Sequence, residues 1–143
     1  MTAPRLALVV GILFLIAGGL GLLPQLAPFA PFDAPVVSLD PHYRMLFGLF
    51  PVNIAHDAIH LLVGIFALIA ARSYASTAAF FRKLFWFYLI VGILGLIPIT
   101  NTLLGVAPIY GWDVVLHLGT AALAGVFGYS RLSAEPARST ADF

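Results

Sequence analysis

The chain contains no cysteine and few charged residues. Only 9% of its 143 residues are Asp, Glu, Lys or Arg. The absence of cysteine excludes disulfides, thiolate metal ligands, thioether attachment of haem and cysteine catalysis. A net charge of +1 without a basic stripe argues against a nucleic-acid partner. Histidine, carboxylate and other polar side chains are therefore left for any chemistry.

Most residues of the chain are apolar. They make up 62% of the chain, and the mean hydropathy of +1.04 lies far outside the range of soluble globular proteins. A helix needs roughly 20 apolar residues to cross a hydrocarbon core about 30 Å thick. The sequence therefore predicts an all-α integral membrane protein with four transmembrane helices, over Leu6–Leu23, Val52–Ala71, Thr77–Ile97 and Asp113–Tyr129.

The four predicted helices form one domain over residues 1–132, followed by a mobile polar tail over residues 133–143. A secretory signal is the competing interpretation of the first helix. Its apolar run is longer than a typical signal core, so we expect a retained helix.

The basic residues orient the predicted helices. Cytoplasmic segments of membrane proteins carry an excess of Lys and Arg. Every basic residue except Arg44 falls at the N-terminus, in the second connector or at the C-terminus: Arg5, Arg72, Arg82, Lys83, Arg131 and Arg138. Both termini are therefore predicted to be cytoplasmic. Interfacial aromatic belts are expected from Tyr110 and Trp112 outside and from Trp86, Tyr88 and Tyr129 inside.

The first outer connector, residues 24–47, is long and rich in proline. It also carries Phe and Val residues that are too apolar for a freely solvated loop, so we expect it to lie along the membrane surface or against a partner. Asp40 and Pro41 match the N-cap and the first position of a helix. A short interfacial helix through Arg44 and Phe47 is therefore predicted.

The two halves of the chain look like copies. Gly48-Leu-Phe-Pro51 precedes the second predicted helix, and Gly105-Val-Ala-Pro108 precedes the fourth. The first and third helices also end alike, in Gly21-Leu-Leu-Pro24 and Gly95-Leu-Ile-Pro98. Two helices per copy preserve orientation, so the copies are predicted to be parallel repeats related by a pseudo-two-fold axis along the membrane normal.

Four ionisable residues open the second and fourth predicted helices. His56 and His60 are four residues apart, as are Asp113 and His117, so each pair shares one helix face. Ionisable groups in membrane spans are expensive and usually face the interior of the helix assembly. Because imidazole and carboxylate suit zinc, copper or iron, His56, His60, Asp113 and His117 are candidate metal ligands.

Other roles are open for the same residues. Asn53 and Asp57 lie close enough in sequence to form hydrogen bonds that orient the ligand side chains. His60 and His117 are also candidate cofactor ligands, either to one haem or to pigment magnesium, although bulky neighbours and the lack of a redox motif argue against haem. Imidazole also suits proton handling. The simplest interpretation is a structural network that holds the helices together.

These observations predict a non-enzymatic accessory or structural subunit, packed against other integral membrane proteins in a larger complex such as a photosynthetic or respiratory one. Small size, the lack of a recognisable catalytic set and the apolar connector support this. A homo-oligomer is compatible with the same features. Metal or haem/pigment binding is the alternative function. A transporter is less favoured, because the inner half of the spans offers no charged path.

The polar segment also carries a family resemblance. Asn53-x-x-His56-x-x-x-His60, followed by leucine, together with the later Asp113 to His117 segment, resembles the bacterial membrane family called domain of unknown function 4383. The resemblance extends from the first helix to Tyr129. The resemblance implies a fold of four helices in a bacterial inner membrane, with this motif. It implies no activity, because none is established for the family. Asp57 and the long proline-rich connector depart from the usual pattern of the family.

Overall fold

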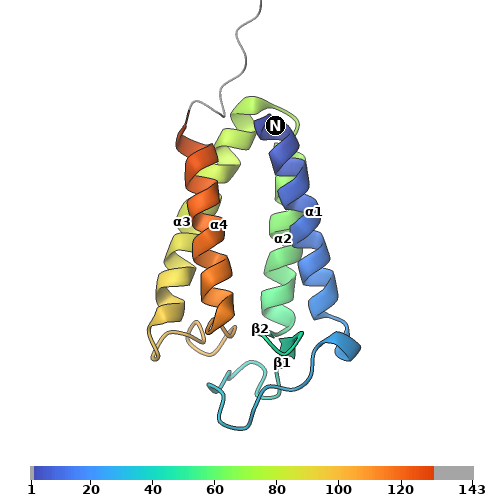
Figure 1. Ribbon diagram of the computed structural model, residues 1–143, viewed down its shortest axis with the longest axis vertical. Helices are drawn as coiled ribbons and strands as arrows, with labels where there is room; N and C mark the ends of the chain where they lie inside the picture. Colours follow the sequence, from blue (N-terminus) through green and yellow to red (C-terminus); the bar gives the residue numbers. More distant parts are fainter. Residues whose placement is uncertain (1, 131–143) are drawn as a thin grey trace, which may run out of the picture.

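The computed structural model describes residues 2–130, which form an all-helical fold of four helices. The helices are α1 (Ala3–Gly21), α2 (Ile54–Ala70), α3 (Tyr74–Leu96) and α4 (Trp112–Tyr129). They make two antiparallel hairpins, because α1 packs along α2 and α3 packs along α4, with far fewer contacts between the hairpins (Figure 1). The four predicted helices are confirmed, with ends shifted by a few residues. The predicted tail lies outside the described residues, as do Arg131 and Arg138.

Two of the helices meet the requirements of a membrane span by length and composition. These are α1, with 19 residues, and α3, with 23 residues. The α2 helix is also apolar but has only 17 residues. Most side chains exposed on the helices are large and apolar, for example Leu13, Phe66 and Ile90.

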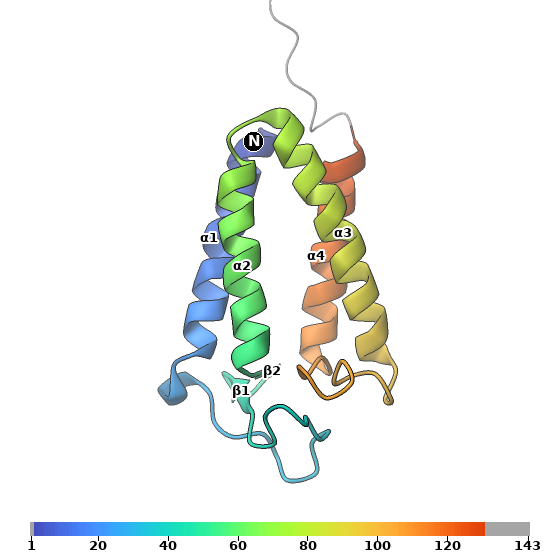
Figure 2. The same cartoon turned by 180° about the vertical axis from the view of Figure 1, so that it is seen from behind.

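The two ends of the molecule differ. One end holds the start of α1 and the short link from α2 to α3, and the other holds the two long connectors (Figures 1 and 2). The short link is fixed by Ser73, whose hydroxyl accepts the backbone N–H of Ser76 at the start of α3. The long first connector contains a short 3-10 helix, η1 (Pro24–Leu26), and two strands, β1 (Arg44–Leu46) and β2 (Phe50–Val52).

The short helix predicted through Arg44 and Phe47 is wrong. This segment is the strand β1, which pairs antiparallel with β2. Phe47 and Gly48 both have positive φ, 54° and 71°, so they turn the chain back on itself and a helix cannot continue through them. The Asp40 side chain, which was expected to cap a helix, accepts one hydrogen bond, from the backbone N–H of His42 two residues further along the chain.

Matching turns precede α2 and α4. Leu104 and Gly105 have φ values of 59° and 87°, which repeats the pair of positive φ values at Phe47 and Gly48. Positive φ is uncommon for a residue other than glycine. A pair of consecutive residues with positive φ thus precedes the second helix of each hairpin, and in the second hairpin Leu103, with a φ of 46°, adds a third.

Packing within the two hairpins also matches. A Cβ atom added at Gly18 of α1 would meet Leu61 of α2, and a Cβ atom added at Gly92 of α3 would meet Leu118 of α4. Small residues at such positions let helix backbones approach closely. In both hairpins, a glycine on the first helix thus makes room for a leucine on the second.

The connectors at the far end are tied to one another. The hydroxyls of Tyr43 and Tyr110 lie 2.9 Å apart, and the Asn53 side-chain amide donates to the backbone carbonyl of Val106 at 2.8 Å. Burial and the hydrogen bond to Tyr110 raise the pKa of Tyr43 above its ordinary value, so this phenol stays neutral. These bonds join the two hairpins at the end where the polar residues lie.

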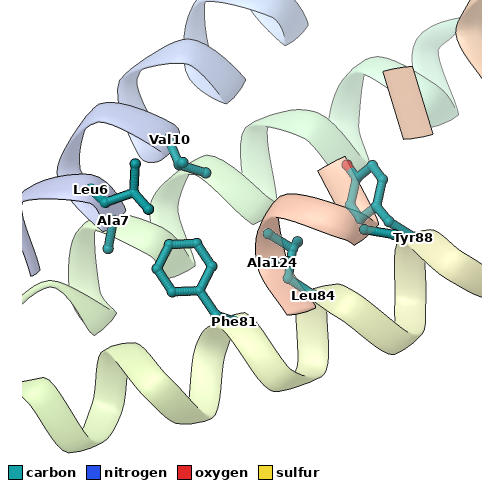
Figure 3. Packing of buried hydrophobic residues seen from close by; sticks show 8 residues of the cluster. Leu6, Ala7, Val10, Phe81, Leu84, Tyr88 and Ala124 are labelled. Atoms are coloured by element: carbon teal, nitrogen blue, oxygen red, sulfur yellow. The ribbon is translucent and has the colours of Figure 1, made fainter. Parts of the chain in front are cut away.

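The apolar core between the hairpins lies toward the opposite end. Figure 3 shows side chains of α1 facing side chains of α3 and α4. The buried cluster consists of Leu6, Ala7, Val10, Phe81, Leu84, Tyr88, Ala121 and Ala124.

Candidate metal centre

Three imidazoles converge between α2 and α4. His56 and His60 come from α2 and His117 comes from α4, and one ring nitrogen from each lies within 4.8 Å of the others. His56 Nε2 and His60 Nε2 lie 3.2 Å apart, within hydrogen-bond distance. His56 and His117 are almost completely buried, with exposed fractions of 3% and 4%. The structure thus brings together the three histidines that the sequence singled out.

Asn53 sets the start of α2 and hence the place of His56. It has an extended backbone, and its side-chain oxygen accepts the backbone N–H of His56 at 2.9 Å, as an N-cap does. Its amide nitrogen meanwhile donates to Val106, in the connector that leads into α4. Asn53 therefore bonds to the backbone of His56, in contrast to the predicted bond to the ring.

Asp113 holds His117 and does not belong to the three-nitrogen group. The Asp113 backbone carbonyl lies 2.8 Å from His117 Nδ1, and its carboxylate Oδ2 lies 3.3 Å from the same atom. A carbonyl only accepts, so Nδ1 carries the proton and Nε2 keeps a free lone pair. Histidine ligands of metals are commonly oriented in this way by a carbonyl or carboxylate. Asp113, predicted as a ligand, is placed here as the residue that orients one.

Two aromatic rings at matching positions of the two hairpins pack on the histidines, each with its own geometry. Phe14 of α1 meets His60 edge to face at 5.3 Å, and Tyr88 of α3 stacks on His117 at 4.9 Å. The interfacial position predicted for Tyr88 is wrong, because its side chain is buried with 2% exposed. A signal for both rings was present: Tyr88 stands seven residues before Gly95, as Phe14 stands seven before Gly21.

Asp57 faces away from the histidines, toward the end of α1. A Cβ atom added at Gly21 would overlap its carboxylate, just as one added at Gly95 would meet Val114 in the other hairpin. Asp57 is buried, and its Oδ1 has no hydrogen-bond partner among the described residues. A carboxylate therefore occupies a packing position that is apolar in the second hairpin. The predicted bond to a ligand histidine is not formed.

A family model described as "Domain of unknown function (DUF4383)" matches residues 5–130. The chain belongs to the DUF4383 family. This confirms the resemblance found in the polar segment. No curated protein and no solved structure matches the chain. The family description assigns no activity to this DUF4383 protein.

The histidine cluster of this DUF4383 protein suits a small ion. Zn–N bonds of about 2.0–2.1 Å in a tetrahedral site place neighbouring ligand nitrogens about 3.3 Å apart. The nitrogens of His56 and His60 already lie at 3.2 Å. An ion suits the site better than a haem between His60 and His117, because the His56 ring lies against both of theirs.

Proposed function

We propose that this DUF4383 protein is a bacterial inner-membrane protein that binds one divalent transition-metal ion through His56, His60 and His117. The observation that carries the proposal is the convergence of three ring nitrogens within 4.8 Å, from the buried His56 and His117 and the half-buried His60. Imidazole is a suitable ligand for zinc, copper or iron. Because the ligands come from both α2 and α4, the ion would join the two hairpins, which is a structural role that needs no catalysis.

The distribution of polar residues supports insertion of all four helices into the membrane. The exposed helix surface is largely apolar, whereas the polar side chains of His56, Asp57, Asp113 and His117 are buried. This is the pattern expected in lipid and the reverse of that in water. The α2 helix, with 17 residues, is about 26 Å long at a rise of 1.5 Å per residue. Because α2 packs along α1 and α4 packs along α3, we propose the same depth in the membrane for all four helices.

The matching turns and glycine contacts support two parallel copies of one hairpin. The contact of Phe14 with His60 has its counterpart in the contact of Tyr88 with His117. A pseudo-two-fold axis along the membrane normal would relate these pairs. The histidine cluster then lies beside the axis, where the two copies meet.

Both termini are proposed to be cytoplasmic, and labelling of single cysteines tests this. The chain has no native cysteine, so each variant carries one site. Asp33→Cys in the outer connector is expected to react with a membrane-impermeant maleimide in intact cells, and Ala75→Cys only after lysis. Both positions are exposed. Equal labelling of both cysteines in intact cells contradicts this orientation. Labelling of Ala75→Cys alone in intact cells would place both termini outside.

Titration with Zn²⁺ tests the metal site. The purified wild-type chain, stripped with a chelator and exchanged into mild detergent, is expected to bind one ion per chain. A titration without a saturable step contradicts the proposal.

A second candidate function is that of an accessory subunit in a larger membrane complex. Its support is the apolar surface of the first connector, where Phe32 is fully exposed and Val36 is 78% exposed. Apolar surface outside the helices favours contact with a partner. Protein extracted in mild detergent is therefore expected to migrate in a complex well above the mass of one chain, and Phe32→Asp is expected to release it. A monomer in native membranes contradicts this second candidate.

A further inference from the structure

A cavity of about 260 Å³ lies between the two hairpins, beside the histidine cluster. Its walls are apolar and include Val10 and Leu13 of α1 and Leu116 and Leu123 of α4. Leu13 and Leu116 are also 58% and 53% exposed, and α1 and α4 share few contacts. The cavity therefore opens between α1 and α4, on the surface that would face lipid.

Two buried polar atoms that make no hydrogen bond lie in the wall of this cavity. The Tyr88 hydroxyl has no hydrogen-bond partner among the described residues. The Asp113 Oδ2 atom makes no hydrogen bond either, and its one polar contact is at 3.3 Å with His117 Nδ1, which already donates to the Asp113 carbonyl. Both residues line the cavity, and their exposed fractions are only 2% and 3%. Figure 3 shows Tyr88 together with Leu84 of the same helix and Val10 of α1, which also line the cavity. Buried polar groups in native proteins are nearly always paired, so these two atoms call for a partner that enters the cavity.

We propose that the cavity binds a lipid-soluble phenol, a molecule with a hydroxylated aromatic ring and an apolar tail. One phenolic hydroxyl can accept a hydrogen bond from Tyr88 and donate one to the carboxylate of Asp113, which satisfies both atoms. The aromatic side chains of Phe14, His60 and His117 also line the cavity and offer edge and face contacts to a flat ring. The ligand chemistry thus follows from two buried atoms that lack a hydrogen bond and from the rings around them.

The size of the cavity limits how much of the ligand it holds. Pockets for drug-sized ligands measure about 300–1,000 Å³. At about 260 Å³, this cavity accepts one ring and the first part of a tail. The rest of the tail leaves between α1 and α4 into the bilayer. The inference rests on the proposed membrane insertion but does not require the metal ion.

The test uses the full chain in lipid nanodiscs and tritium-labelled 4-decylphenol as the probe. Partition into lipid does not saturate, so specific binding is the saturable part, expected at one molecule per chain. Decylbenzene, which lacks the hydroxyl, is expected not to compete, and dodecan-1-ol, which lacks the ring, is expected to compete more weakly. Saturable binding that either molecule displaces as well as unlabelled 4-decylphenol overturns the proposal, as does the absence of saturable binding.

Three variants locate the binding. Tyr88→Phe keeps the ring and removes one hydrogen bond, so it is expected to weaken binding about tenfold. Ala17→Phe fills the cavity and is expected to abolish binding, whereas Ala79→Phe, on the exposed side of α3, is the matched control and is expected to leave it unchanged. Equal binding by wild type and Ala17→Phe overturns the assignment to this cavity. Helical content by circular dichroism confirms that each variant is folded.

Parallel Zn²⁺ titrations of the same samples separate the two proposals. If the wild-type protein binds Zn²⁺ but shows no saturable binding of 4-decylphenol, only the phenol site is overturned. Phenol binding that persists in a chelator supports this site, even where the metal site fails.

Discussion

Replacing His117 by Ala is expected to abolish Zn²⁺ binding, while replacing His42 leaves it unchanged. His117 is the one ligand that α4 contributes, so its loss leaves only the two imidazoles of α2. Residues that merely orient a ligand already account for about 10–100-fold in metal affinity. Loss of a ligand should therefore weaken binding by more than about 100-fold. His42 is exposed in the first connector and serves as the matched histidine control.

Calorimetric titration and thermal unfolding of the same samples measure this effect. A ligand present at 100 times its Kd stabilises the folded state by about 2.7 kcal/mol. The metal-dependent rise in Tm is therefore expected in wild type and in His42→Ala, and is expected to vanish in His117→Ala. Asp113→Asn should lie between them, because it leaves all three imidazoles and weakens only the orientation of His117. A His117→Ala variant that still binds one ion tightly would show that the cluster is not the site.

Local patterns in the sequence predicted most of the fold. The four helices follow from apolar runs of the right length, and the shared faces of His56 with His60 and of Asp113 with His117 follow from spacing within one helix. The family, too, was evident from this polar segment. What these features have in common is that each depends on residues close together in the chain.

Features that depend on contacts between distant segments were missed. Tyr88 was expected at the inner membrane boundary with Trp86 and Tyr129, because tyrosine and tryptophan are enriched there, yet its ring stacks on His117 of α4. The Asp40-Pro41 signal for a helix was overridden by the turn at Phe47 and Gly48. Neither outcome is encoded within a few residues. Comparison of the two halves could have found Tyr88, since it matches Phe14 in position.

Gly18→Leu is expected to destabilise the α1–α2 hairpin far more than the same change at the adjacent Gly19. A Cβ atom at Gly18 would lie 2.8 Å from the backbone oxygen of Asp57 and 2.9 Å from Leu61 Cγ. A backbone atom cannot rotate out of the way, so the two helices must separate. A Cβ atom at Gly19 meets nothing within 4 Å. Both changes replace glycine by leucine within one helix, so differences in helix propensity cancel.

Overpacking of a tight contact typically costs about 1–3 kcal/mol. The measurement is the free energy of unfolding in mild detergent, without metal, for Gly18→Leu, for the milder Gly18→Ala and for Gly19→Leu. The expected order of destabilisation is Gly18→Leu, then Gly18→Ala, with Gly19→Leu close to wild type. A result in which Gly19→Leu costs as much as Gly18→Leu would mean that α1 and α2 do not approach through this face.

The same measurements of unfolding free energy compare the contribution of helix packing with that of the polar cluster. Hydrogen bonds between membrane helices average only about 0.6 kcal/mol in double-mutant cycles. His60→Ala, measured without metal, is therefore expected to cost less than Gly18→Leu. The two effects are linked, because a Cβ atom at Gly18 would also lie 3.1 Å from the Cβ of His60. Gly18→Leu should thus displace a metal ligand and weaken Zn²⁺ binding as well. If His60→Ala proves the more damaging change without metal, the polar cluster itself holds the hairpins together, and the close approach of α1 and α2 is secondary.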